Sequence, residues 1–180
     1  MRPPIEPMRA AGVAELPEPR LCRGGCAYQP KFDGWRAIAT VLDGEMISFE
    51  AAAGRTSFSA LQRRVTAGRA LSREAAARPA SLVCFDLLGD ADGELLTEPL
   101  ARRRDRLQTL LAGAPTALPV CPQTTDYEQA RRWLDELAAT GVEGVVVKDL
   151  AGRYRPGRPG WWKYKSVGDD SAADAMSCGL

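Results

Sequence analysis

The sequence has no histidine among its 180 residues. This absence removes every mechanism that depends on a histidine general base. Net charge is almost absent as well, because 24 lysines and arginines stand against 23 aspartates and glutamates and leave +1 at pH 7. The sequence therefore lacks the overall basic footprint of a nucleic-acid-binding protein, although a local cluster of basic residues would still allow such a partner.

Long apolar segments are also missing. No apolar run reaches the length of a transmembrane helix. The first residues, Met1-Arg2-Pro3-Pro4, lack the apolar centre of a signal peptide. We therefore expect no contact with a membrane and a cytoplasmic location.

Cysteines are few and odd in number: Cys22, Cys26, Cys84, Cys121 and Cys178. An odd count without a secretory signal argues against a disulfide framework. Cys22 and Cys26 are four positions apart, but no second pair and no histidine accompany them, which argues against a zinc site. Cys84 and Cys121 lie in apolar runs and are expected to be core thiols.

The length and the hydrophobic content of 45% suit one folded domain with a sizeable core. Residues 1–25 are rich in proline, arginine and glycine, and we expect them to form an extended N-terminal arm. Residues 26–165 are expected to form the folded domain. Residues 166–180 are small and polar without periodicity, which predicts a tail.

Strands and helices alternate along the expected domain. The apolar patterns predict strands at 26–30, 35–41, 45–49, 82–88, 118–121, 145–148 and 161–165. They predict helices at 57–77, with a break at Gly68, at 98–111 and at 126–139, the first and last capped by Ser57 and Asp126. The run Arg102-Arg103-Arg104 with Arg106 is expected to be a solvated helix face. The interleaving favours a mixed sheet over a strictly parallel one.

One short stretch, Lys31-Phe32-Asp33-Gly34-Trp35-Arg36, allows two interpretations. Asp-Gly between two apolar-leaning runs is a hairpin signal, in which case Lys31 and Arg36 would be solvated cross-strand charges. In the other interpretation Lys31 is a nucleophile. Four further blocks follow in order: Leu42-Asp43-Gly44-Glu45, Phe85-Asp86-Leu87-Leu88, Glu143-Gly144-Val145-Val146-Val147-Lys148 and Trp162-Lys163-Tyr164-Lys165.

These five blocks resemble the covalent nucleotidyltransferases, most closely the nucleotidyltransferase domain of bacterial-type ATP-dependent DNA ligases, from about Gly25 to Lys165. The resemblance implies an α+β, ATP-grasp-like nucleotidyltransferase fold, with antiparallel or mixed sheets flanked by helices and the nucleotide in the cleft between them. It implies that Lys31 accepts AMP from ATP with Mg²⁺. The AMP would then pass to a 5′-phosphate at a nick in double-stranded DNA, in DNA repair and recombination.

The resemblance also assigns roles to the remaining positions. Gln29 stands where the family usually has a glutamate that contacts the adenine amino group. Arg36 would contact the nucleotide sugar or phosphate, and Phe85 would stack on adenine, although it could equally be a core aromatic. Glu143 would be the metal-associated carboxylate, and Glu45 would bind the ribose or the metal; alone, each would be a surface charge. The phosphate-binding cations would be Lys148, Lys163 and Lys165.

The residue types make chemical sense together. A lysine attacks phosphorus only as a neutral amine, whereas its ordinary pKa is about 10.4, so neighbouring cations or burial must lower it. Lys148 ends a buried-type strand and must reach water or an anion. Lys163 and Lys165 are two apart on a strand and face the same side, which is unfavourable unless an anion such as phosphate lies between them.

The sequence departs from the family pattern at three places. Only residues 37–41 separate Arg36 from the Leu42 block, where the family has two strands, a helix and a Ser-Arg-x-Gly motif, so this segment is interpreted as deleted. Pro159 stands where an arginine is expected, and Arg158 comes one residue early. No oligonucleotide-binding (OB) barrel follows Lys165, and we expect a monomer, with a separate OB-type or repair partner as one option. The alternatives are an RNA ligase or capping-type enzyme, or an impaired remnant that binds nucleotide or DNA.

Overall fold

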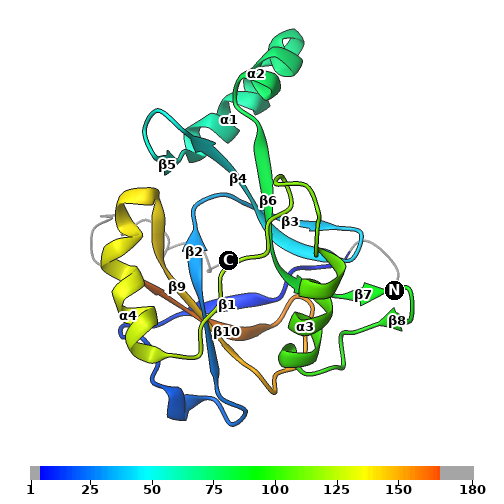
Figure 1. The fold of residues 1–180 in the computed structure, drawn as a ribbon, viewed down its shortest axis with the longest axis vertical. Helices are drawn as coiled ribbons and strands as arrows, with labels where there is room; N and C mark the ends of the chain where they lie inside the picture. Colours follow the sequence, from blue (N-terminus) through cyan, green and yellow to red (C-terminus); the bar gives the residue numbers. More distant parts are fainter. Residues whose placement is uncertain (1–4, 167–180) are drawn as a thin grey trace, which may run out of the picture.

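The computed structural model describes residues 5–166. Two four-stranded sheets, a two-stranded ribbon and four α-helices make up most of the described residues (Figure 1). The expected α+β class, with antiparallel and mixed sheets flanked by helices, is confirmed. The tail expected from residue 167 onward lies outside the described residues.

The first sheet has the strand order β1-β10-β9-β2. Its central strand β9 (Val142–Asp149) runs antiparallel to β2 (Cys26–Phe32) and to β10 (Pro159–Lys165). The edge strand β1 (Arg9–Gly12) pairs in parallel with β10. Part of the N-terminal arm is therefore a sheet strand, and a short 3-10 helix, η1 (Pro19–Leu21), follows it.

The second sheet is centred on β4 (Leu42–Glu50). Antiparallel partners are β3 (Trp35–Ala39), the short β5 (Arg55–Thr56) and β6 (Ala80–Leu87). Residues 117–121 run beside β6 through backbone bonds such as Cys121 N–H to Cys84 O, but only Val120 makes a ladder bridge. The strand expected at 118–121 is therefore wrong, since Pro119 within it has no N–H to donate. A two-stranded ribbon, β7 (Gly89–Asp90) with β8 (Gly93–Glu94), follows β6.

Asp33-Gly34 does not close a hairpin, so that interpretation of the stretch is wrong. β2 before it belongs to the first sheet, and β3 after it belongs to the second. The dipeptide carries the chain between sheets, and Gly34 passes so close to β4 that a Cβ there would lie 2.3 Å from the Met46 carbonyl oxygen. The hairpin that does form joins β3 to β4, with Thr40 at φ 58°.

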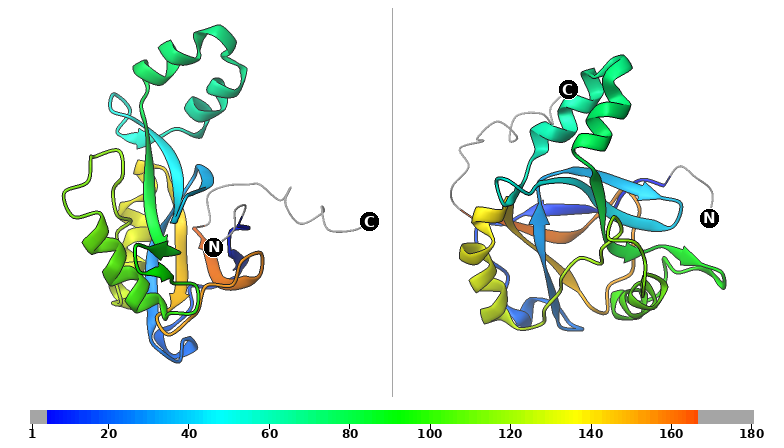
Figure 2. Two further views of the ribbon diagram at one scale, coloured as in Figure 1. Left: turned by 90° about the vertical axis from the view of Figure 1, so that its right-hand side faces the viewer. Right: turned by 45° about the horizontal axis from the view of Figure 1, so that its top comes forward.

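Helices form where the sequence predicts them. Ser57 caps α1 (Phe58–Thr66) by accepting the N–H of Ala60, and Gly68 begins the 3-10 turn η2 (Gly68–Ala70) that separates α1 from α2 (Leu71–Ala77). α1 and α2 project beyond the sheets (Figures 1 and 2). The other helices are α3 (Leu100–Leu110) and α4 (Tyr127–Glu136), the latter capped by Asp126 and followed by η3 (Ala138–Thr140).

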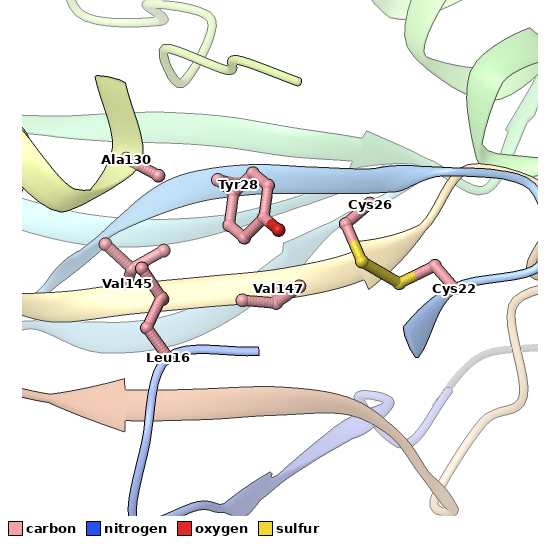
Figure 3. Close-up of a cluster of buried hydrophobic side chains, with 7 residues drawn as sticks. All are labelled: Leu16, Cys22, Cys26, Tyr28, Ala130, Val145 and Val147. Atoms are coloured by element: carbon pink, nitrogen blue, oxygen red, sulfur yellow. A yellow bond between two sulfur atoms is a disulfide. The ribbon is translucent and has the colours of Figure 1, made fainter. Parts of the chain in front are cut away.

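One face of the first sheet is closed by α4. Tyr28, Val145 and Val147 pack there against Ala130 of α4 and against Leu16 of the N-terminal arm (Figure 3). Because side chains alternate along a strand, residues on either side of these positions face the opposite way, toward the second sheet. On the second sheet, α3 covers a separate cluster that includes Leu87, Cys84 and Leu107.

Cys22 and Cys26 form a disulfide at the edge of the first cluster, with 5.2 Å between their Cα atoms (Figure 3). The expectation that the chain contains no disulfide is therefore wrong for this pair. An odd total says nothing about two cysteines that a tight loop brings together. Cys84 and Cys121 are buried free thiols, as expected, and burial raises the pKa of both, to about 11 and about 12.

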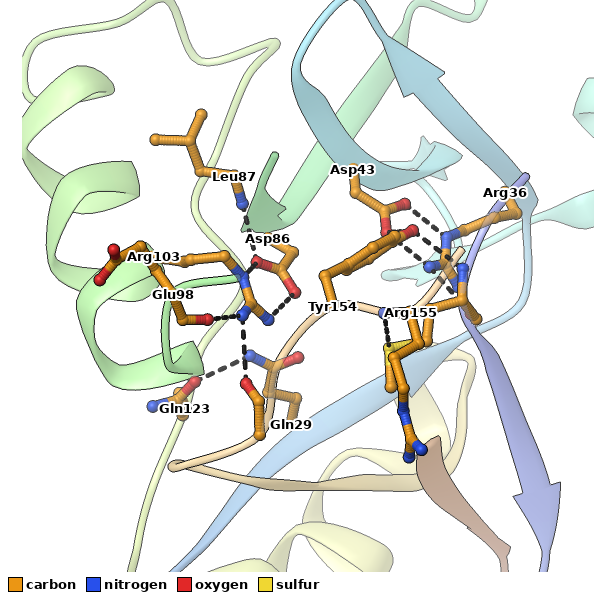
Figure 4. A network of polar contacts seen from close by, with 12 residues as sticks. Gln29, Arg36, Asp43, Asp86, Leu87, Glu98, Arg103, Gln123, Tyr154 and Arg155 are labelled. Carbon is orange, nitrogen blue, oxygen red and sulfur yellow. Dashed lines mark hydrogen bonds and ion pairs between the residues drawn. The ribbon is translucent and has the colours of Figure 1, made fainter. Parts of the chain in front are cut away.

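The arginine run in α3 is not a solvated face at its centre. Arg103 is 1% exposed and donates two hydrogen bonds to buried Asp86, at 2.7 and 2.9 Å (Figure 4). Arg104 is also buried, and it donates to the Cys121 carbonyl. The expectation holds for Arg102, which is exposed. Within residues 5–166, no helix combines the length and the apolar character needed to cross a membrane.

Candidate active site

A cavity of about 650 Å³ lies where the two sheets and the N-terminal arm meet. It is lined by residues of β2, β9 and β10 from the first sheet and of β3, β4 and β6 from the second. Seven of the nine site residues predicted from sequence line it: Gln29, Lys31, Arg36, Glu45, Phe85, Lys148 and Lys163. The other two, Glu143 and Lys165, adjoin it through contacts with Lys31 and with each other.

Strand register explains why the first-sheet residues share one face. Lys31 of β2 and Lys165 of β10 both lie opposite Gly144 of β9, one on each side. Gln29 and Lys163 likewise both lie opposite Val146. Directly paired residues project to the same face of a sheet. Four polar side chains distant in sequence therefore line up across three neighbouring strands.

Glu143 reaches this face because of a β-bulge. The partner of β2 changes from Gly144 at Lys31 to Val142 at Phe32, which leaves Glu143 as an extra residue on β9. A bulge redirects a side chain that strict alternation would point to the opposite face. Lys31 Nζ donates a hydrogen bond to Glu143 Oε2, and Lys165 Nζ lies 3.5 Å from the same oxygen.

The two carboxylates of the site have opposite electrostatic environments. Burial raises the pKa of Glu143, but the hydrogen bond and charge of Lys31, with Lys165, outweigh it and bring the pKa below its ordinary value. Burial dominates at Glu45 and raises its pKa to about 7, although Arg36 and Lys31 oppose this shift. Glu143 is thus a fixed anion, whereas Glu45 changes charge near neutral pH.

Lys148 is fully buried instead of reaching water or an anion, which corrects the expectation from sequence. Its side chain is 1% exposed and its ammonium finds no hydrogen-bond partner among the described residues. The ammonium lies 4.0 Å from the ring centre of Trp161 and 4.3 Å from that of Phe85. Burial lowers the pKa of Lys148 to about 8. Its charge is therefore held at the cavity wall by the two aromatic faces, and the charges of Asp86 and Asp43 also favour it.

Arg36 is held by a partner that the sequence did not single out. Its Nε and Nη2 donate to the two carboxylate oxygens of Asp43, each at 2.6 Å, and Nη2 also donates to the Met8 carbonyl (Figure 4). Tyr154 donates its hydroxyl to Asp43 at 2.7 Å and accepts the Met8 N–H. Asp43 lies in the Leu42-Asp43-Gly44-Glu45 block, so the sequence could have pointed to it as a site residue. Trp161, which packs edge-on against Phe85, carried no such signal.

Gln29 is 2% exposed and lies at the cavity wall. Its Nε2 donates to Oε1 of Gln123 at 2.8 Å. Gln123 comes from the irregular segment before α4, 94 positions away, and sequence reasoning missed it. Arg158 and Pro159, the positions that depart from the family pattern, do not line the cavity.

No cluster of three or more histidine, cysteine or acidic side chains able to hold a metal exists within residues 5–166. A magnesium ion needs no such cluster when a nucleotide is present, since it is usually bound by one or two carboxylates together with substrate phosphates and water. Glu45 and Glu143, both in contact with or close to Lys31, supply hard oxygen ligands of the right kind. The donor set therefore fits Mg²⁺ bound jointly with a polyphosphate.

Comparison with known families decides the affiliation of the chain. The model of the ATP dependent DNA ligase domain matches residues 35–165, which is most of the chain. The chain belongs to this family. The match begins four positions after Lys31.

Individual relatives extend the similarity to nine-tenths of the chain. DNA ligase C2 of Mycolicibacterium smegmatis is 29% identical over 199 residues, which cover 91% of this chain and 54% of the relative. DNA ligase C of Mycobacterium tuberculosis is 29% identical over 205 residues, covering 92% of this chain and 55% of the relative. This ligase-family chain thus spans about half the length of these curated relatives.

Solved structures of the ligase family share the fold. A mycobacterial DNA ligase D, solved in complex with ATP and MES, is 26% identical, with a TM-score of 0.63 over 89% of this chain and 60% of that one. The Chlorella virus DNA ligase-adenylate is 16% identical with a TM-score of 0.57, which supports the fold alone. The family and the fold inferred from the five sequence blocks are therefore confirmed.

Proposed function

We propose that this chain is the adenylation domain of an ATP-dependent DNA ligase, in which Lys31 attacks the α-phosphorus of ATP and becomes lysyl-AMP. The observation that carries the proposal is the position of Lys31: its amine lies in the cavity, paired with Glu143 and flanked by Lys165. A nucleophilic lysine needs cations nearby, both to favour the neutral amine and to neutralise the triphosphate. ATP is the nucleotide found in the structure of the related ligase D.

The lysine must be released from Glu143 before it can attack. The ammonium proton first passes to water, which reaches the partly exposed side chain. The lone pair then forms the new N–P bond as the P–O bond to pyrophosphate breaks. Pyrophosphate then departs with the negative charge. Lys163 and Lys148, on neighbouring strands of the same sheet face, are positioned to balance this charge. Arg36 and Gln29 would hold the sugar and the base, with Phe85 against the ring.

Magnesium bound by Glu143 and Glu45 would neutralise phosphate charge and orient the leaving group. When Lys31 leaves Glu143, the magnesium ion would supply the positive charge that this carboxylate has lost. The chain's own residues then have a simple task. The carboxylates hold the cation, the lysines face the phosphates, and the buried aromatic wall excludes water from the far end of the cavity.

The direct test is covalent labelling of the purified chain with α-³²P-ATP and Mg²⁺. We expect label with the stability of a phosphoramidate, labile in acid and stable in alkali, which maps to the Lys31 peptide and is absent from Lys31→Ala. Lys165→Ala is a second test variant, because it keeps the nucleophile and removes one flanking cation. It should lower the labelling rate without changing which residue is labelled. Label on Lys148 or Lys163 would contradict the assignment, and no label with wild type would favour the impaired remnant.

We further propose that AMP passes to the 5′-phosphate at a nick in double-stranded DNA, and that the helical lobe, residues 55–79, contacts the duplex. This lobe carries six arginines and one acidic residue, Glu74, in a chain whose net charge is +1. Arg55, Arg69 and Arg73 are exposed, and α2 contributes no buried residue to the core. Basic residues concentrated on a projecting element suit the phosphate backbone.

Binding to a nicked duplex tests this surface. The double variant Arg69→Glu/Arg73→Glu should weaken binding and reduce the slope of log affinity against log salt by about 2, one for each lost phosphate contact. Arg131→Glu/Arg132→Glu, on exposed positions of α4, is the matched charge control. Equal weakening by both pairs would contradict a specific role for the lobe. We also propose a monomeric, cytoplasmic protein that works with a separate OB-type or repair partner.

A further inference from the structure

We infer that Gln123 is a specificity-determining residue that fixes the Gln29 side-chain amide so that the cavity accepts adenine and rejects 6-keto purines. The inference rests on the proposed function, because it assumes that the cavity binds a purine nucleoside triphosphate. It names a residue outside the five blocks and outside the strands that build the site.

The contact is well defined. Gln29 Nε2 donates to Gln123 Oε1 at 2.8 Å, and Gln29 is 2% exposed (Figure 4). A primary amide has two donors on nitrogen and an acceptor on oxygen. With Nε2 turned toward Gln123, Gln29 Oε1 points the other way, as Figure 4 shows. No donor among the described residues reaches that oxygen, which therefore remains available to a ligand at the cavity wall.

Two facing amides can pair in two ways. If both turned over, Gln123 would donate, Gln29 Oε1 would accept, and the Gln29 NH₂ group would be the one left available. A carboxylate at position 29 would have no such choice, since it only accepts. Because this chain has glutamine there, the partner at position 123 becomes the group that decides which atom the ligand meets.

The charges around the cavity favour the observed orientation. Lys31, Arg36, Lys148 and Lys163 all line it. The negative end of the Gln29 amide dipole is stabilised when it faces these cations. Gln123 Oε1 completes the arrangement by accepting from the opposite end.

The group at purine position 6 then decides which base can pair with Gln29. The 6-amino group of adenine donates a hydrogen bond to an outward-facing carbonyl oxygen. Hypoxanthine and guanine carry an oxygen at position 6, so two acceptors would face each other with no proton between them. A buried polar group left unpaired costs about 1–3 kcal/mol, so discrimination of roughly 10- to 100-fold is expected.

The test measures equilibrium dissociation constants for ATP and inosine triphosphate by calorimetry without magnesium, where no covalent step occurs. The two nucleotides differ at purine position 6, amino in one and keto in the other, and at N1, which carries a proton only in hypoxanthine. Wild type should bind ATP about 10- to 100-fold more tightly. Gln123→Glu, which can only accept, should preserve this ratio. Gln123→Lys, which can only donate, should turn the Gln29 amide and bring the ratio below one, and Gln123→Leu should bring it toward one.

Gln62→Lys, an exposed position on α1, makes the same charge change away from the cavity and should keep the wild-type ratio. Circular dichroism and melting establish that each variant is folded. A folded Gln123→Lys protein with the wild-type ratio overturns the inference, as does wild type that binds both nucleotides equally. Labelling of Lys31 is a separate measurement: if it fails while base discrimination follows position 123, the proposed function falls and the inference stands.

Discussion

Replacing Lys148 by methionine separates the contribution of this residue to stability from its contribution to nucleotide binding. Lys148 is buried, without a hydrogen-bond partner among the described residues, against Phe85 and Trp161. Methionine keeps a flexible apolar stem of similar length and removes the charge. We expect the variant to be more stable than wild type at pH 7 and to bind ATP at least about 10-fold more weakly, because a cation is lost from the cavity wall.

The magnitude follows from the pKa. Burial lowers the pKa of Lys148 from 10.5 to about 8, and each unit corresponds to about 1.4 kcal/mol, so holding the charge in the folded protein at pH 7 costs about 3 kcal/mol. Two aromatic contacts offset about 1–2 kcal/mol of this. The net gain from methionine is about 1–2 kcal/mol, or about 2–8 °C in melting temperature for a domain of this size.

The stabilisation by methionine should depend on pH. The unfolded chain holds the Lys148 proton more tightly than the folded one, so wild-type stability rises as pH goes from about 8 to 10.5. The advantage of methionine should therefore be full below pH 8 and should fade by about pH 10. Urea unfolding at pH 7 and pH 10 measures it, with Lys163→Met, a partly exposed lysine of the same sheet face, as the control. Destabilisation at pH 7, or a gain equal at both pH values, would refute the reasoning.

Two further predictions concern the buried carboxylate of Asp86 and the partly buried carboxylate of Glu45. Asp86→Asn should lower the free energy of unfolding by about 3–5 kcal/mol, because it leaves the buried Arg103 charge without its carboxylate, and chemical denaturation measures the loss. Glu45→Gln should have little effect at pH 5 and should stabilise the fold at pH 8 by about 1–2 kcal/mol after solvent screening. The sign follows because burial raises the pKa of Glu45 from 4.5 to about 7, so stability is lost as pH rises through this range; melting at both pH values checks it.

Local signals in the sequence were sufficient for most elements. Ser57 and Asp126 cap their helices through the N–H groups that the cap positions predict, and Gly68 interrupts the first helix as expected. The buried-type strand ending at Lys148 is the centre of the first sheet. These features depend on a few neighbouring residues, which is why a single sequence reveals them.

Long-range pairing was the part that sequence reasoning missed. Asp33-Gly34 has the composition of a hairpin turn, yet its flanking strands join different sheets, because each finds a better partner elsewhere: β2 beside β9 and β3 beside β4. The arginine run was misjudged for the same reason. Arg103 has an acidic partner 17 positions away on a strand, and no periodicity within the helix reports that partner.

The orientation of Glu143 in the site also depends on long-range strand pairing. By strict alternation it would face α4 together with Val145 and Val147, and the charge would be buried against an apolar cluster. The bulge opposite Lys31 and Phe32 removes this conflict and turns the carboxylate toward Lys31. Gly144 makes the close packing possible, since a Cβ there would lie 2.0 Å from the Tyr164 carbonyl oxygen. Glu143 and Gly144 therefore act together: the glycine lets β10 approach, and the extra residue places the carboxylate that Lys31 and Lys165 share.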